Sequence, residues 1–339
     1  MKQGLLFLAA GALAFATAVA QAALSSVEVS DTAILENRLP QTLGEYGFFV
    51  DASGQVPAVG VVPYRLNVPL YSDGAEKLRF AYVPKGKQAL ADGEGLLQFP
   101  VGSALIKTFA FGEGEGRRLI ETRLLLHRAD GWVALPYRWN AEQTEARLAL
   151  AGARVPVITP SGEELNYRIP NKNQCKECHG LNDEVTPLGP KARNLSAAWL
   201  EQMVAAKHLD AMPAGADVFS LWEARDQAEP AKAARAYLDV NCAHCHQPGA
   251  TASNSGLDLR WEQGDPHPIG IFTRPVAAGR GAGGYEFSIV PGQPEDSILL
   301  YRMESIEPGV AMPELGKGTV DAEGVAAVRK WVAGMESER

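Results

Sequence analysis

The sequence predicts a multidomain protein in which an N-terminal all-β, sandwich-like domain precedes two mainly α modules. Between residues 43 and 170, short segments alternate apolar and polar residues and are separated by glycine-containing turns, a pattern typical of strands. After residue 170 the alternation gives way to helical spacing around two copies of one cysteine–histidine motif. We therefore expect a β-rich domain at 43–170, a first module at 171–227 and a second module at 228–339.

Length, composition and charge are those of a globular chain. It has 339 residues, of which 46% are hydrophobic and 21% are charged, so it can bury a sizeable core and form more than one domain. The formal net charge is −8 at pH 7, and an acidic chain lacks the basic surface that nucleic acid attracts. We therefore expect no nucleic-acid partner, and we expect protein partners to present a basic docking patch.

The N-terminus has the features of a secretory signal peptide. Lys2 precedes an apolar run at 4–19, and Ala20-Gln21-Ala22 has the small-residue pattern of a cleavage site. We expect a signal peptide at 1–22, followed by a linker or arm at 23–42. The run is short for a membrane span and no later stretch is long and apolar enough, so the processed chain is not expected to span a membrane. A periplasmic location follows from export.

Strands are expected where the alternation is clearest. The segments concerned are 78–83, 105–111, 119–126, 132–139 and 146–150. This half contains no catalytic constellation. Its turn-rich stretch at 63–74 is either a binding loop or an ordinary connection.

Helices are expected mainly in the second half of the chain. Ser196 is placed to cap a helix at 197–209, and Pro230 opens a helix that leads into Asn241. A short helix at 296–305 and a terminal helix capped by Asp321 follow.

The cysteines define the chemistry of the chain. All four belong to two Cys-x-x-Cys-His motifs, Cys175-x-x-Cys178-His179 and Cys242-x-x-Cys245-His246. In this pattern the two thiols bond to the vinyl groups of a haem, and the adjacent histidine becomes the proximal ligand of its iron. The sequence therefore predicts two covalently bound haem c groups, and the two α modules are expected to be cytochrome c-type haem modules.

Two other uses of these cysteines compete with haem attachment. A zinc site places its two Cys-x-x-Cys pairs about 15–20 residues apart, whereas 63 residues lie between Cys178 and Cys242. A redox dithiol or a disulfide needs no histidine after the pair, and here a histidine follows both pairs. Haem attachment explains both histidines and is therefore the predicted role of the cysteines.

The sixth ligand of each iron is expected to be a methionine, which favours electron transfer over ligand chemistry. Met312 is the candidate for the second haem, while Met303 lies on a helical face and fits a core position better. Met212 is the candidate for the first haem because its Ala-Met-Pro context repeats that of Met312. For the first haem, His208 as the ligand and an open or otherwise filled sixth position remain alternatives to Met212. Met203 shares an apolar helix face and fits a core position better.

Groups around the haems can also be suggested. A proximal histidine normally donates its second ring N–H to a carbonyl, which Pro187 or Pro190 could supply. Arg274 or Arg280 could bind haem propionates, or both could be solvated. His244, inside the second motif, is expected to be exposed.

Several stretches together resemble one family. They are 71–77, 118–125, 170–179, 187–195, 237–246, 274–281, and Met303 with 312–316. On these residues the chain resembles the bacterial dihaem c-type cytochromes that carry a β-rich N-terminal half. The resemblance spans nearly the whole processed chain, and it implies covalent haem c and electron transfer outside the cytoplasm.

Three functions are compatible with these features. The first is an electron carrier, not an enzyme, that passes electrons between redox protein partners in the periplasm through two haems. The second is an enzyme similar to dihaem peroxidases, with one open haem site, although the late and closely spaced motifs depart from that family. The third is an electron-accepting subunit of a periplasmic dehydrogenase, whose β half would bind a substrate such as a saccharide. We favour the first.

Overall fold

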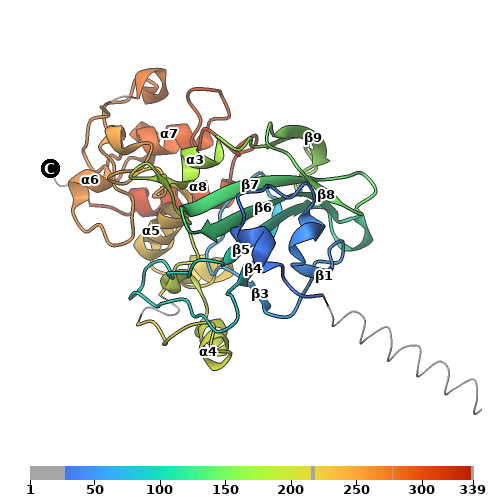
Figure 1. Ribbon diagram of the computed structural model, residues 1–339. Helices are drawn as coiled ribbons and strands as arrows, with labels where there is room; N and C mark the ends of the chain where they lie inside the picture. Colours follow the sequence, from blue (N-terminus) through green and yellow to red (C-terminus); the bar gives the residue numbers. More distant parts are fainter. Residues whose placement is uncertain (1–26, 215–217, 277, 337–339) are drawn as a thin grey trace, which may run out of the picture.

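A six-stranded antiparallel sheet is the largest element of the structure (Figure 1). The computed structural model describes residues 27–214, 218–276 and 278–336, so the signal peptide predicted at 1–22 lies outside the described residues. The strands follow one another in sequence order as β3 (Val61–Tyr64), β4 (Glu76–Tyr82), β5 (Ala104–Phe111), β6 (Arg118–Arg128), β7 (Gly131–Trp139) and β8 (Ala146–Leu148).

The five segments predicted as strands are confirmed as β4 to β8. The first strand of the sheet, β3, was not predicted because it is short and contains a proline, which is tolerated at a sheet edge. Three two-stranded hairpins lie outside this sheet. They are β1 (Phe49–Asp51) with β2 (Val56–Pro57), β9 (Ala153–Ile158) with β10 (Glu164–Ile169), and β11 (Gly180–Leu181) with β12 (Glu184–Val185).

One face of the sheet is covered by the start of the chain rather than by a second sheet. The helix α2 (Asp31–Leu35) and the 3₁₀ turn η1 (Leu43–Tyr46) share a hydrophobic core with this face. The buried hydroxyls of Tyr46 and Tyr137 are hydrogen-bonded at 3.0 Å. A sandwich requires two extended sheets packed face to face, and within the described ranges no second sheet exceeds two strands. The predicted sandwich is therefore wrong.

The opposite face of the sheet is covered by elements from later in the chain. At one end, Leu105 packs in a cluster with Leu200 on α4 (Ala197–Ala205). At the other end, Phe109 packs against Tyr167 on β10. The side chains between these two apolar regions face the interior cavity described below.

The prediction of two mainly α modules is also wrong. Besides α4, the helices of the second half are α3 (Cys175–His179), α5 (Pro230–Asn241), α6 (Pro266–Ile269), α7 (Ile298–Glu304) and α8 (Ala322–Ala333). Long stretches between them are irregular because prolines such as Pro187 and Pro190 lack the N–H that a helix needs. The backbone there bonds to the β half instead, and Leu97 donates its N–H to the Pro190 carbonyl. The chain is thus a mixed β and α structure.

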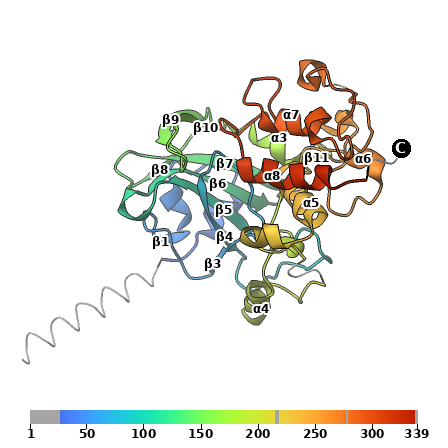
Figure 2. The ribbon, with the colours of Figure 1, turned by 180° about the vertical axis from the view of Figure 1, so that it is seen from behind.

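The predicted helix signals are confirmed in most positions. Ser196 and Asp321 cap α4 and α8 with their side chains, and Pro230 begins α5. The helix α4 ends at Ala205, earlier than predicted, and Lys207 beyond it has a positive φ of 58° that a helix cannot contain. Seen from behind, α5 and α8 pack side by side (Figure 2).

A buried carboxylate joins the two motif-bearing regions. Asp239 on α5 accepts hydrogen bonds from Lys191 at 3.0 Å and from Arg193 at 2.9 Å. It also accepts the backbone N–H of Trp261 at 3.1 Å. Burial alone would raise the pKa of Asp239, but Lys191 and Arg193 lower it below its usual value. The loop after the first motif is therefore tied to the helix that leads into the second.

No helix in the described part of the chain is long and apolar enough to cross a membrane.

Replacing Asp239 by Asn should lower the free energy of unfolding by about 3 kcal/mol at pH 7, because Lys191 and Arg193 would lose their buried counter-charge. The pKa of Asp239 is lowered on folding, so its contribution is complete above about pH 4 and is lost as the pH falls further. Urea unfolding at several pH values measures this, with the exposed Asp226→Asn as control. Equal effects of the two substitutions would contradict the prediction.

Candidate functional site

Both Cys-x-x-Cys-His motifs line one cavity between the sheet and the C-terminal helices. Its volume is about 700 Å³, within the range of cofactor sites. In both views the helix α3, which carries the first motif, lies between the sheet and the C-terminal helices (Figures 1 and 2). Apolar side chains form much of the wall, among them Leu66, Leu70, Leu188, Leu257, Leu299 and Leu315. The fold therefore brings together two motifs that are far apart in the sequence.

The imidazole of His179 is oriented for binding a metal through Nε2. Its Nδ1 lies 2.9 Å from the carbonyl oxygen of Thr186. A carbonyl only accepts, so Nδ1 carries the proton and the lone pair of Nε2 is free. Burial, reinforced by the charge of Lys107, lowers the pKa of His179 to about 4, which keeps the ring neutral at pH 7. The predicted carbonyl acceptor is present, but it belongs to Thr186 rather than to Pro187 or Pro190.

His246 in the second motif is oriented in an equivalent way by a side chain. Its Nδ1 lies 2.9 Å from the hydroxyl of Ser255, and that hydroxyl donates its own hydrogen to the carbonyl of Ala252 at 2.7 Å. The hydroxyl is therefore an acceptor for His246 Nδ1–H, and Nε2 is again free. Burial lowers the pKa of His246 to about 4. Ser255 was not identified from the sequence because no pattern marks a serine nine residues after a histidine as its partner.

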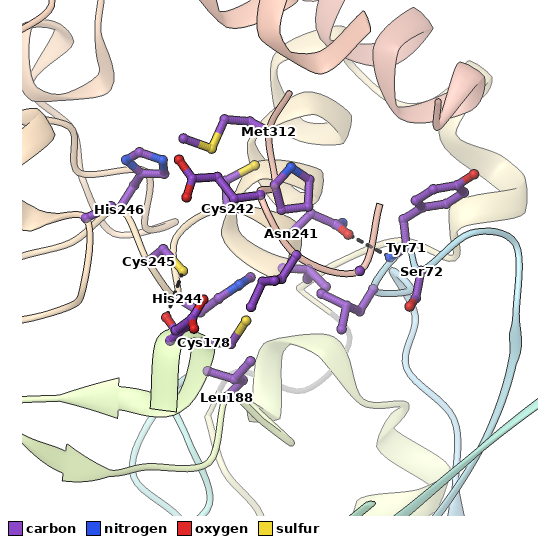
Figure 3. A pocket seen from close by; sticks show the side chains of 18 of the residues that line it. Tyr71, Ser72, Cys178, Leu188, Asn241, Cys242, His244, Cys245, His246 and Met312 are labelled. Carbon is purple, nitrogen blue, oxygen red and sulfur yellow. Dashed lines mark hydrogen bonds between the residues drawn. The ribbon is translucent and has the colours of Figure 1, made fainter. Parts of the chain in front are cut away.

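The second cysteine of each motif lies at the point where the motifs meet. The sulfurs of Cys178 and Cys245 and a ring nitrogen of His244 all lie within 4.8 Å of one another. Figure 3 shows these residues in the middle of the cavity, between Leu188 and the end that holds His246. His244 is half-buried, and its Nδ1 is buried without a hydrogen-bond partner among the described residues, although we expected this side chain to be exposed.

The first cysteines lie farther from this meeting point and belong to the same cavity. Cys175 is buried, and burial raises the pKa of its thiol. Burial also raises the pKa of Cys242 to about 12. All four cysteines are free thiols in the structure.

Met312 is held at the cavity by a well-bonded loop. Its N–H donates to the Arg302 carbonyl at 3.0 Å, and the ammonium of Lys317 donates to the Met312 carbonyl at 2.9 Å. Arg302 in turn donates to the Val310 carbonyl at 2.9 Å. The Met312 side chain lies next to His246 in Figure 3, and both line the cavity. The structure therefore places the predicted distal ligand beside the second motif.

Met212, the candidate for the first haem, does not reach the cavity. Its side chain is 41% exposed, and it is not among the residues that line the cavity. Met203, for which core packing was the simpler prediction, is buried in the cluster between the sheet and α4. Met303 is buried in the C-terminal core and touches the cavity wall.

Residues of the turn at 63–74 hold the second motif in place, which the sequence did not reveal. The N–H of Tyr71 donates to the Asn241 side chain at 2.7 Å, directly before Cys242 (Figure 3). A carboxylate oxygen of Asp73 accepts from the N–H groups of Gly318 and Thr319 at 2.6 and 3.0 Å. The turn therefore connects the β half to the residue before the second motif and to the segment after Met312.

The two arginines suggested for haem propionates lie outside the cavity. Arg274 forms an ion pair with Glu286, and Arg280 forms one with Glu307 at 2.8 Å. Both arginine side chains are mostly exposed.

No family model, curated protein or solved structure matches the chain.

The haem-free chain should bind Co²⁺ through Cys178, His244 and Cys245, because three soft or borderline donors already lie close together. The Cys178→Ser substitution should weaken this binding by roughly tenfold or more and remove much of the thiolate-to-cobalt absorption. The chain without residues 1–22, produced in the cytoplasm and titrated with Co²⁺, tests this. Cys175→Ser is the matched control, and an equal loss in both variants would argue against the cluster.

Proposed function

We propose that this protein is a periplasmic dihaem c-type cytochrome that transfers electrons between redox protein partners. The proposal rests on the matching hydrogen bonding and protonation of the two motif histidines. His179 and His246 each have Nδ1 engaged with an acceptor, a free Nε2 and a neutral ring at pH 7. Neutral imidazole with a bonded second nitrogen is the form that ligates iron.

The residues of the cavity fit two covalently held haem groups. Cys175 and Cys178 would hold the first, and Cys242 and Cys245 the second, through thioether bonds. When bound, haem c supplies an iron that takes up and releases single electrons. The chain's part is to attach, orient and enclose it, and the apolar wall of the cavity suits a porphyrin.

The geometry supports two electron sites held close together. The sulfurs of Cys178 and Cys245 lie within 4.8 Å of each other, and each would be an attachment point of a different group. The protein would therefore hold the edges of the two groups side by side. This arrangement suits electron transfer from one haem to the other better than it suits two haems that act independently.

A peroxidase-like enzyme is the second candidate, and one observation favours it. Met212 lies outside the cavity, so the expected methionine is not in place at the first motif. A haem there with no protein ligand in its sixth position could react with peroxide. Binding of carbon monoxide to one reduced haem would support this candidate over the electron carrier.

The holoprotein exported by a host with a haem c attachment system should contain two covalent haems per chain. The double substitutions Cys175→Ser with Cys178→Ser, and Cys242→Ser with Cys245→Ser, should each leave one haem, because each motif holds its own group. Pyridine haemochrome absorbance against protein concentration, with the mass of the intact chain, gives the number. A wild-type chain without covalent haem would refute the proposed function.

Replacing Met312 by Ala should remove the ferric methionine-to-iron charge-transfer absorption of one haem and lower its midpoint potential, because the thioether ligand is lost. Met212→Ala is the matched control, and we expect it to leave the spectrum unchanged because its side chain lies outside the cavity. Optical spectra and redox titration of both variants check this. A spectral change in Met212→Ala alone would reverse the assignment.

A further inference from the structure

A row of three cations crosses the sheet face that looks into the cavity. Arg79 on β4 is the cross-strand partner of Lys107 on β5, and Lys107 is the partner of Arg123 on β6. Neighbouring strands are about 4.8 Å apart, so the three side chains emerge in a line perpendicular to the strands. All three line the cavity that contains the two motifs.

Among the described residues, one acidic side chain pairs with the row, and it pairs with Arg123. Glu121 is completely buried and binds Arg123 at 2.9 Å, and it also accepts the hydroxyl of Tyr167 at 2.7 Å. Arg79 donates only to the backbone carbonyl of Lys77, at 3.1 Å, and Lys107 has no hydrogen bond or ion pair among the residues that the structure describes. Like charges directly opposite each other destabilise a sheet. Burial, together with the charges of the two arginines, lowers the pKa of Lys107 to about 7, and its ammonium lies 5.3 Å from the centre of the Phe109 ring.

The surroundings direct the row toward the cavity. Apolar clusters containing Leu105 and Phe109 flank it along β5, so Lys107 is the one polar position between them on this face. The first motif is near, because α3 and β12 both pack on β7 of the same sheet. Burial raises the pKa of the Cys175 thiol, and the charges of Arg123 and Lys107 oppose this rise. An anion that neutralises the row would therefore lie inside the cavity.

We propose that Arg79, Lys107 and Arg123 form a carboxylate-binding site on the sheet. The planar fork of Arg79 matches the geometry of a carboxylate, and Lys107 adds a point charge. Arg123, whose Nε and Nη2 bind Glu121, contributes its remaining N–H groups. The carboxylates come either from the propionates of a bound haem or from a small soluble dicarboxylate. The first source rests on the proposed function, and the second does not.

The test uses the holoprotein and its Lys107→Met variant, with redox titration of both haems. If propionates occupy the site, Lys107→Met lowers the midpoint potential of one haem, because loss of a nearby cation favours the ferric state. We expect at least a tenfold change in the oxidised-to-reduced ratio, which is about 59 mV for one electron. Lys107→Arg should restore the midpoint. Lys172→Met, exposed and close to the first motif, should leave it unchanged.

Addition of succinate at constant ionic strength distinguishes the two sources. A midpoint that moves with succinate in the wild type and not in Lys107→Met identifies a soluble dicarboxylate. Two bound haems whose potentials respond neither to Lys107→Met nor to succinate overturn the site and leave the proposed function standing. If no haem is attached, the proposed function fails, and calorimetry with succinate decides the site alone: no binding overturns it. If Lys107→Met does not fold, Arg79→Gln takes its place with the same expectations.

Discussion

The buried carboxylate of Asp239 is the interaction on which the arrangement of the two motif regions depends. A charge removed from water must be paired, and its partners Lys191 and Arg193 come from the loop after the first motif. Because α5 ends where the second motif begins, that pairing also determines where Cys242 lies relative to the first motif. The proposed meeting of two electron sites is thus a consequence of how one buried charge is satisfied.

The β half takes part in the site. Tyr71 holds Asn241 and Asp73 holds the loop near Gly318, so one turn bonds to the chain before the second motif and to the segment after Met312. The sheet itself forms a wall of the cavity. Residues of the β half and of both motif regions therefore line one cavity.

The sequence could predict those features that depend on neighbouring residues. Alternation identified β4 to β8, and Ser196 and Asp321 were identified as helix caps. Segments far away in the sequence decide what covers each face of the sheet. The alternation therefore predicted a sandwich, whereas one face is covered by α2 and η1. Met212 and Met312 have the same neighbours in the sequence, Ala before and Pro after. Only tertiary packing places Met312 at the cavity and Met212 at the surface.

The row of three cations on the sheet is a second feature that the sequence alone could not predict. Arg79, Lys107 and Arg123 look like solvated charges in the sequence, because each lies in an ordinary alternating strand. The register of β4, β5 and β6 aligns them, and the burial of the face by β10 and the motif regions turns them inward. A sheet gains nothing in stability from three aligned cations. The anionic group proposed above would give these cations a counter-charge on the cavity wall that they share.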